Sequence, residues 1–431
     1  MAKQTDHALN QALIYEINPY SFSDQHGFRG IADDLPRLKK LGVDIVWLMP
    51  IHPRNRLDLA SGLYASAYSV RDYRAINPDY GTEEDFDEMV GTIHRHGMKM
   101  MMDIVYNHTA RDSVLAQTHP EWFYHDKEGK PSPRVWKDCC DLDYSHKELW
   151  DYQIETLLYW TKRGVDGFRC DVGPMVSVDF WLAVRKAVDA VDPDHIWLCE
   201  SSDHEFIRNN RSRGWHCASD SEMYEAFDMT YDYDVLFEYV EATRGRAPIA
   251  GYIDGLIRQQ STYPENYIKL HFLENHDQLP AASFIRLKEQ LMQWTAFCYF
   301  LKGAMLLYNG QEFMNTWRLW EQNGEYRTML RKDDPDFTKL LLNLSAIKKM
   351  PIIKDGIFRL DHIKQDSVVT IRYNGQNGGQ LMGIFNLRLL PGEAEAETEE
   401  GEYQNLLSGQ FVTVKNGKII LPVEPIIIYK Q

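Results

Sequence analysis

Carboxylates at the ends of short apolar runs are the clearest chemical signal in this chain. Asp171 follows Gly-Phe-Arg-Cys, Glu200 follows Ile-Trp-Leu-Cys, and Asp277 closes Glu-Asn-His-Asp. Neighbouring parallel strands would bring such residues to one rim, because strands lie about 4.8 Å apart. Two carboxyl groups about 5–5.5 Å apart are what glycoside cleavage with retained configuration requires. We therefore expect Asp171 to act as the nucleophile and Glu200 as the general acid and base.

The residue types beside this pair fit the same chemistry. Arg169 lies two residues before Asp171, so both side chains project to the same side of a strand. A cation there favours the ionised carboxyl, so we expect a low pKa for Asp171. Glu200 must instead be held partly protonated by burial and nearby negative charge. Asp103, near the end of an earlier apolar run, is expected to brace Arg169 in an ion pair.

Alternating apolar runs and helical patterns predict the scaffold that positions these residues. Eight strands with eight crossovers describe a closed parallel barrel, so the predicted fold class is α/β, a (β/α)8 TIM barrel. Chemistry on such a barrel lies at the C-terminal ends of the strands. The predicted strands are Leu13–Ile17, Val43–Met49, Met98–Val105, Gly167–Asp171, Ile196–Glu200, Phe227–Tyr231, Lys269–Glu274 and Met305–Tyr308. The predicted helices include 147–162, 179–190, 203–211, 234–243, 283–300 and 337–349.

Two segments depart from this rhythm. Residues 108–144 are rich in proline and lack periodicity, which indicates a long insertion after strand three. From about residue 350 the pattern changes to period two, which predicts a small antiparallel β domain. Residues 392–402 are acidic and are expected to form a solvated loop. The predicted division is 1–107 with 145–349 for the barrel, 108–144 for the insertion, and 350–431 for the β domain.

Composition limits the partners. The formal net charge of −16 argues against nucleic acid or an anionic membrane, because both need a basic face. No apolar run reaches the roughly 18 residues of a membrane span. The six cysteines show no paired framework and no metal-binding spacing, which favours reduced thiols. We therefore expect a cytoplasmic protein that acts on a neutral substrate; its oligomeric state stays open.

Taken in order, the motifs resemble those of the α-amylase family, glycoside hydrolase family 13. The resemblance covers essentially the whole chain. It includes DxxxNH, GFRxD, a glutamate after strand five, and NHD, which match Asp103-Asn107-His108, Gly167–Asp171, Glu200 and Asn275-His276-Asp277. Asp141-Leu142-Asp143 resembles the end of the family's inserted domain B.

The resemblance implies further roles. Asp277 would stabilise the distorted, oxocarbenium-like transition state. The residues that would hold or stack on the sugar are Tyr68, His108, Arg169 and His276. The insertion would be a short domain B, and the tail would be the family's C-terminal β-sandwich domain C. Aromatic residues near the rim can serve either as sugar platforms or as ordinary packing: Tyr64, Trp122, Phe123 and Trp136.

A calcium site is also implied by the resemblance. Asn107 and Asp141 match positions that hold calcium in many relatives through oxygen ligands. The alternative is that both residues only hydrogen-bond domain B to the barrel. Calcium is not needed for the chemistry in either case.

Three departures from the family pattern matter, and the first of them bears on the acceptor side. Pro174 and Met175 stand where many amylases have Lys-His, and Pro280 stands where an arginine is common. The inserted segment is also short. The expected activity is hydrolysis of α-1,4-glucosidic bonds in starch or maltooligosaccharides through a covalent glycosyl-Asp171 intermediate. The alternatives are an α-glucanotransferase or an α-glucosidase of the same family, and a non-catalytic glucan-binding protein.

Overall fold

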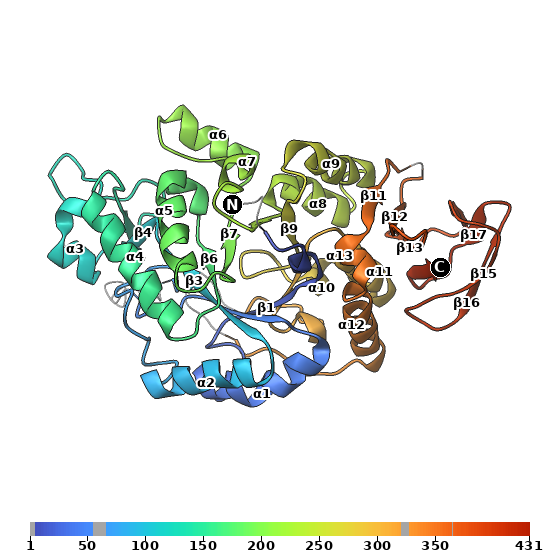
Figure 1. Ribbon diagram of the computed structural model, residues 1–431, viewed down its shortest axis with the longest axis horizontal. Helices are drawn as coiled ribbons and strands as arrows, with labels where there is room; N and C mark the ends of the chain where they lie inside the picture. Colours follow the sequence, from blue (N-terminus) through green and yellow to red (C-terminus); the bar gives the residue numbers. More distant parts are fainter. Residues whose placement is uncertain (1–4, 55–65, 320–326, 364) are drawn as a thin grey trace.

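A closed barrel of eight parallel strands forms the centre of the molecule (Figure 1). The computed structural model describes residues 5–54, 66–319, 327–363 and 365–431. The strand order around the barrel is β1-β10-β9-β8-β7-β6-β3-β2, which confirms the predicted (β/α)8 fold. The strands are β1 (Leu13–Ile17), β2 (Ile45–Leu48), β3 (Lys99–Ile104), β6 (Gly167–Cys170), β7 (Ile196–Cys199), β8 (Met229–Tyr231), β9 (Ile268–His271) and β10 (Ala304–Tyr308).

Helices surround the barrel, and their apolar faces cover its outer surface (Figure 1). The longer ones are α1 (Gly27–Leu41), α2 (Glu83–Arg95), α4 (Lys147–Lys162), α5 (Val178–Asp189), α6 (His204–Ser212), α8 (Leu236–Thr243), α9 (Ile249–Thr262), α11 (Lys288–Phe300) and α12 (Pro335–Lys348). Short helices are η2 (His7–Gln11), η5 (Gly173–Met175), α7 (Asp220–Met223), η6 (Tyr233–Val235), α10 (Ala281–Phe284), η7 (Gln311–Phe313) and α13 (Pro351–Asp355). Thr82 caps α2: Thr82 and Asp85 exchange side-chain and backbone hydrogen bonds.

Two helical predictions were wrong. No helix was expected at α9, which contains two glycines and therefore has low helix propensity. Packing decides here: α9 buries Tyr252, Ile253 and Leu256. At Gly255 any side chain would collide with Val235. The single helix predicted over 283–300 is instead divided into α10 and α11.

Alternation along the strands separates the inside of the barrel from the outside. Ile14, Trp47 and Leu198 belong to an apolar cluster that fills the barrel interior. Their neighbours Leu13 and Tyr15 pack outward against the helices. Because the period is two, polar residues in phase with the inner cluster must also face the interior. This rule places the site residues described below.

The insertion after β3 forms a small unit of its own. Its strand β4 (His108–Ala110) pairs antiparallel with β5 (Cys139–Asp141), and His108 lies opposite Asp141. Between them lie α3 (Val114–Thr118) and η4 (Pro120–Trp122). In Figure 1 this segment lies at the left, at the opposite end of the molecule from the C-terminal sheets.

Two antiparallel four-stranded sheets form the C-terminal part, as the period-two pattern predicted. Their facing sides bury an apolar cluster that includes Met382, Ile384 and Ile428. One sheet consists of β11 (Ile357–Leu360), β12 (Val368–Asn374), β13 (Gln380–Asn386) and β18 (Ile426–Lys430). The other consists of β14 (Glu393–Glu395), β17 (Lys418–Ile420), β16 (Phe411–Lys415) and β15 (Gly401–Gln404). The expected loop at 392–402 is therefore partly strand, because Ala394 is buried between the sheets.

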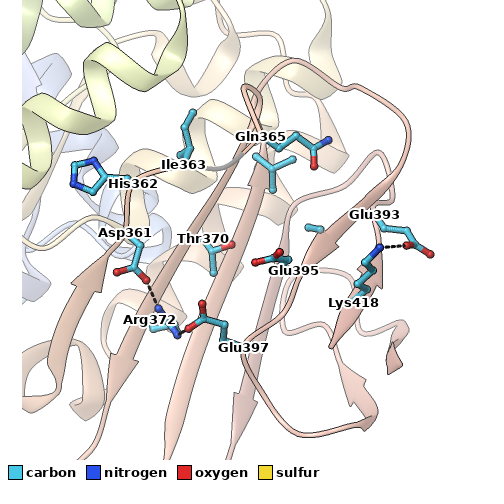
Figure 2. Close-up of a pocket in the computed structure, with 12 residues that line it drawn as sticks. Asp361, His362, Ile363, Gln365, Thr370, Arg372, Glu393, Glu395, Glu397 and Lys418 are labelled. Atoms are coloured by element: carbon cyan, nitrogen blue, oxygen red, sulfur yellow. Dashed lines mark hydrogen bonds and ion pairs between the residues drawn. The ribbon is translucent and has the colours of Figure 1, made fainter. Parts of the chain in front are cut away.

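A charged pocket opens between these two sheets (Figure 2). Arg372 forms ion pairs with Asp361 and Glu397, and Lys418 pairs with Glu393 at 3.4 Å. Among the described residues that line the pocket there is no phenylalanine, tyrosine or tryptophan. The pair between Arg372 and Glu397 joins the two sheets, whereas Lys418 and Glu393 pair within one sheet. These ion pairs stabilise the sheet packing.

All six cysteines are free and buried. Within the described ranges, none of the helices has both the length and the apolar composition needed to cross a membrane.

Candidate active site

Four charged side chains meet at the C-terminal end of the barrel interior. The guanidinium of Arg169, on β6, is completely buried. One of its nitrogens lies 2.9 Å from Asp103 Oδ1 and 2.8 Å from Asp171 Oδ1, and another lies 3.0 Å from Glu200 Oε1. Asp103 and Arg169 are direct neighbours in the register of β3 and β6. One cation thus holds three carboxylates from three adjacent strands.

Burial dominates the acid–base properties of the central pair. It raises the pKa of Glu200 to about 7, and the neighbouring Asp171 and Asp277 charges add to this effect while Arg169 opposes it. Burial also raises the pKa of Asp171 to about 6, although Arg169 lowers it. The expectation of a low pKa for Asp171 was therefore wrong, because desolvation outweighs the nearby cation. Glu200 still has the higher pKa of the two carboxyl groups, as expected from the sequence.

A second group of hydrogen-bonded polar side chains lies beside the Arg169 cluster. His276 pairs with Glu16 through Nδ1, and its Nε2 lies 3.3 Å from Asp277 Oδ2 and 2.8 Å from the Tyr68 hydroxyl. That hydroxyl donates to Asp103 at 2.9 Å. Burial lowers the pKa of His276, but Asp277 and Glu16 outweigh it and raise the pKa to about 9. His276 is therefore a cation at neutral pH.

Asp277 differs from the other two catalytic candidates in its exposure. Its side chain is 45% exposed, whereas those of Asp171 and Glu200 are almost buried. It thus lies at the open mouth of the site, beside the His276 cation.

Comparison with known families decides the classification. The catalytic-domain family described as "Alpha amylase, catalytic domain" matches residues 16–139 and 134–339, which together cover most of the chain. The "Bacterial Alpha amylase C-terminal domain" family matches residues 359–428. The chain belongs to the α-amylase family.

Solved α-amylase structures resemble it over their full length. An α-amylase from Lactobacillus plantarum is 40% identical, with a TM-score of 0.93 over 99% of this chain and 100% of that one. The noncanonic maltogenic α-amylase AmyB from Thermotoga neapolitana is 34% identical, with a TM-score of 0.86 over 98% and 99% of the two chains.

The curated relatives are longer than the matched part. The probable oligo-1,6-glucosidase 3 of Bacillus subtilis is 25% identical over 366 residues, which covers 70% of this chain and 65% of the relative. Alpha-amylase 3 of Dictyoglomus thermophilum is 24% identical, and 64% of it is covered. This α-amylase family chain therefore spans less than two thirds of the length of these first relatives.

The remaining predicted sugar contacts lie at the same end of the barrel. His108 is buried, which lowers its pKa although Asp141, Asp138 and Glu200 oppose the shift. The Tyr68 ring stacks on the His276 ring at 5.2 Å. Direct contact of Arg169 with a sugar stays a prediction, because its contacts in the structure are with the three carboxylates.

One of the departures from the family pattern, Met175, lies in an apolar cluster. Pro174 and Met175 belong to η5, which begins two residues after Asp171. Met175 packs in this cluster with Trp136, Cys217 and Phe206. Pro280 precedes α10.

The other predicted rim aromatics are mainly packed. Trp136 lies 5.0 Å from the His108 ring, which leaves it beside the site. Trp122 stacks on His119 at 3.9 Å, and Phe123 is buried. Tyr64 lies outside the described residues.

Sequence reasoning missed several members of the site. Glu16 lies on β1 and forms an ion pair with His276. Trp47 lies on β2, with its ring 5.3 Å from the Arg169 guanidinium. Tyr231 on β8 accepts a hydrogen bond from Arg169 Nε at 3.3 Å, and Tyr233 accepts one from Asn275 at 3.0 Å. Glu16 carried a usable signal, because a charged residue in a buried strand is rarely left without a partner.

The two positions expected to hold calcium are joined by a side chain. Arg134 Nε lies 2.9 Å from Asp141 Oδ2, and its Nη2 lies 3.4 Å from Asn107 Oδ1. The structure therefore brings Asn107 and Asp141 together around a guanidinium.

Proposed function

We propose that this protein is a retaining α-glucan hydrolase that cleaves α-1,4-glucosidic bonds of maltooligosaccharides or starch. One observation carries the proposal. Asp171 and Glu200, on the adjacent strands β6 and β7, are held by the same buried guanidinium. Neighbouring strands place two such carboxyl groups at the short separation that retention requires, about 5–5.5 Å.

The first step forms a covalent bond to the enzyme. A carboxylate oxygen of Asp171 attacks the anomeric carbon as the bond to the leaving glucan oxygen breaks. The proton of Glu200 passes to that oxygen. The raised pKa of Glu200 keeps this proton available at neutral pH, while Asp171, with its lower pKa, is already ionised.

The second step restores the enzyme. Glu200, now a carboxylate, takes a proton from water, and the resulting hydroxyl replaces Asp171 at the anomeric carbon. Two inversions leave the α configuration unchanged. Transfer to a sugar hydroxyl instead of water would use the same intermediate.

The bordering residues are proposed to bind and orient the sugar. Asp277, at the open mouth, is placed to accept hydrogen bonds from sugar hydroxyls. The His276 cation beside it is a hydrogen-bond donor with its charge fixed by Glu16. Tyr68 and Trp136 offer aromatic faces near the same end of the barrel.

A product time course tests this proposal. Purified enzyme is incubated with maltoheptaose, and the anomers are followed by NMR while chain lengths are measured by chromatography. We expect shorter sugars released first as α-anomers. Release of β-anomers, or an unchanged substrate, would overturn the proposal.

Parallel incubations separate the alternatives. Chains longer than maltoheptaose, increasing with acceptor concentration, would identify a glucanotransferase. Glucose as the first and only small product would identify an α-glucosidase. Faster cleavage of isomaltotriose than of maltotriose would show a preference for 1,6 bonds.

The pH profile of kcat/KM should be bell-shaped, with its maximum between about pH 6 and 7. Below this range Asp171 gains a proton and stops acting as a nucleophile, because its pKa is raised to about 6. Above it Glu200 loses the proton that the leaving group needs, because its pKa is raised to about 7. The two limbs belong to the coupled pair. Initial rates on maltoheptaose from pH 4 to 9 measure them.

A substrate with a fluoride leaving group provides the internal control. Fluoride departs without protonation, so the alkaline limb should move to higher pH for α-maltosyl fluoride when its first step limits the rate. An alkaline limb at the same pH for both substrates would contradict the assignment of Glu200 as the acid.

A further inference from the structure

Three segments of the chain meet around the side chain of Arg134. Asn107 follows β3 of the barrel, Asp141 ends β5 of the inserted segment, and Arg134 comes from the loop before β5. The Arg134 guanidinium contacts Asp141 Oδ2 at 2.9 Å and Asn107 Oδ1 at 3.4 Å. One cation thus bridges the barrel and the insertion.

The surroundings hold this guanidinium in place. Its side chain is 10% exposed, and that of Asp141 is fully buried. The guanidinium lies over the ring of Tyr124 at 4.2 Å and near that of Trp215 at 5.7 Å. Tyr124 belongs to the inserted segment and Trp215 follows α6, so the contacts reach a third part of the structure. Aromatic faces attract cations, which adds to the ion pair.

A calcium ion does not fit these residues as they are arranged. Calcium takes six to eight oxygen ligands. Here both expected side chains already contact a guanidinium, and that positive charge would repel a second cation at the same oxygens. Asp141 Oδ1 has no hydrogen-bond partner among the described residues, so one oxygen remains. Those residues include no group of three histidine, cysteine, aspartate or glutamate side chains that could hold a metal.

We propose that Arg134 is a built-in structural cation that fastens the inserted segment to the barrel in place of a calcium ion. The inference does not depend on the proposed function. Its consequence reaches the site, because Asp141 lies opposite His108 in the β4–β5 pairing. Fixing Asp141 therefore fixes the strand that carries His108.

The first test uses the unaltered protein and calcium alone. Apparent Tm is measured by calorimetry after extensive treatment with EDTA, and again with millimolar CaCl2. We expect the same Tm in both conditions and no calcium retained in elemental analysis. A Tm that falls on chelation and recovers with calcium, together with one calcium bound per chain, would overturn the proposal.

The second test removes the charge. Arg134→Met keeps an unbranched side chain but leaves Asp141 buried without its cation, so apparent Tm should fall by about 5–10 °C. Limited proteolysis should cut within residues 108–144 at least several-fold faster. Arg134→Lys keeps the charge but not the planar guanidinium, so its apparent Tm should fall less than that of Arg134→Met.

A matched control separates this role from general charge loss. Lys130→Met removes an exposed cation from the same segment, where Lys130 pairs with Glu128 at the surface. It should leave Tm and proteolysis unchanged. An Arg134→Met protein as stable as the control would overturn the proposal. If Arg134→Met does not fold, the Arg134→Lys variant and the chelation experiment still decide.

Discussion

Replacing Asp171 by asparagine should lower kcat on maltoheptaose by about 10⁴-fold or more, while the protein stays folded. The amide has the size of the carboxylate but cannot attack the anomeric carbon. Arg169 keeps its ion pairs with Asp103 and Glu200, so the buried cation is not left alone. Initial rates report the loss, and circular dichroism with a thermal scan reports the fold.

Asp179→Asn is the matched control for this loss. Asp179 is exposed in the first turn of α5 and lies outside the carboxylate cluster. Its substitution should leave kcat within about two-fold, as expected for a surface position. Near-normal turnover by a folded Asp171→Asn protein would remove Asp171 from the role of nucleophile.

Replacing Glu200 by glutamine should lower kcat/KM on maltoheptaose by about 10³-fold, because the leaving oxygen no longer receives a proton. The amide oxygen can still accept the hydrogen bond that Val172 N–H donates to Glu200 Oε2 at 2.8 Å. The site should therefore keep its shape, and the loss should be chemical.

An activated substrate distinguishes loss of the proton donor from a disturbed site structure. α-Maltosyl fluoride needs no protonation to leave, so Glu200→Gln should still form the glycosyl-enzyme. Its hydrolysis should slow, because no base activates water. The intermediate should then accumulate, and mass spectrometry of a peptide digest should find the added sugar on Asp171.

Glu225→Gln serves as the control for this substitution. Glu225 is exposed in the segment between α7 and β8. The Glu225→Gln substitution should leave the rates on maltoheptaose and on α-maltosyl fluoride unchanged. If formation of the glycosyl-enzyme from the fluoride slowed as much as cleavage of maltoheptaose, Glu200 would support the site structurally and would not be its acid.

The barrel could be predicted from the sequence because each strand is a compact apolar signal. The prediction Leu13–Ile17 coincides with β1, and Lys147–Lys162 coincides with the predicted helix 147–162. The failures occurred where local propensity and tertiary packing disagree. Helix α9 contains glycines that favour a loop, yet its buried face against α8 and the barrel stabilises the helix. Strand β14 carries exposed glutamates around a single buried alanine.

The chemistry of the site was only partly visible in the sequence. Residue types and strand ends identified Asp171, Glu200 and Arg169, because alternation fixes which side chains face the barrel interior. The pKa of Asp171 depends on the balance between burial and the Arg169 cation, and that balance follows from the depth of the site. The contact between Glu16 and His276 joins β1 to the segment that follows β9, and these lie far apart in the sequence.

By itself the sequence determined the fold family, the strand ends and the residues placed there, since these follow from local periodicity and short motifs. Only the tertiary structure decided which charges meet. The register of β3, β6 and β7 gathers three carboxylates on one arginine. The folding of the insertion brings Arg134 to Asp141 and Asn107. Contacts of this kind depend on closure of the barrel and on loop packing, and no short segment of the chain contains that information.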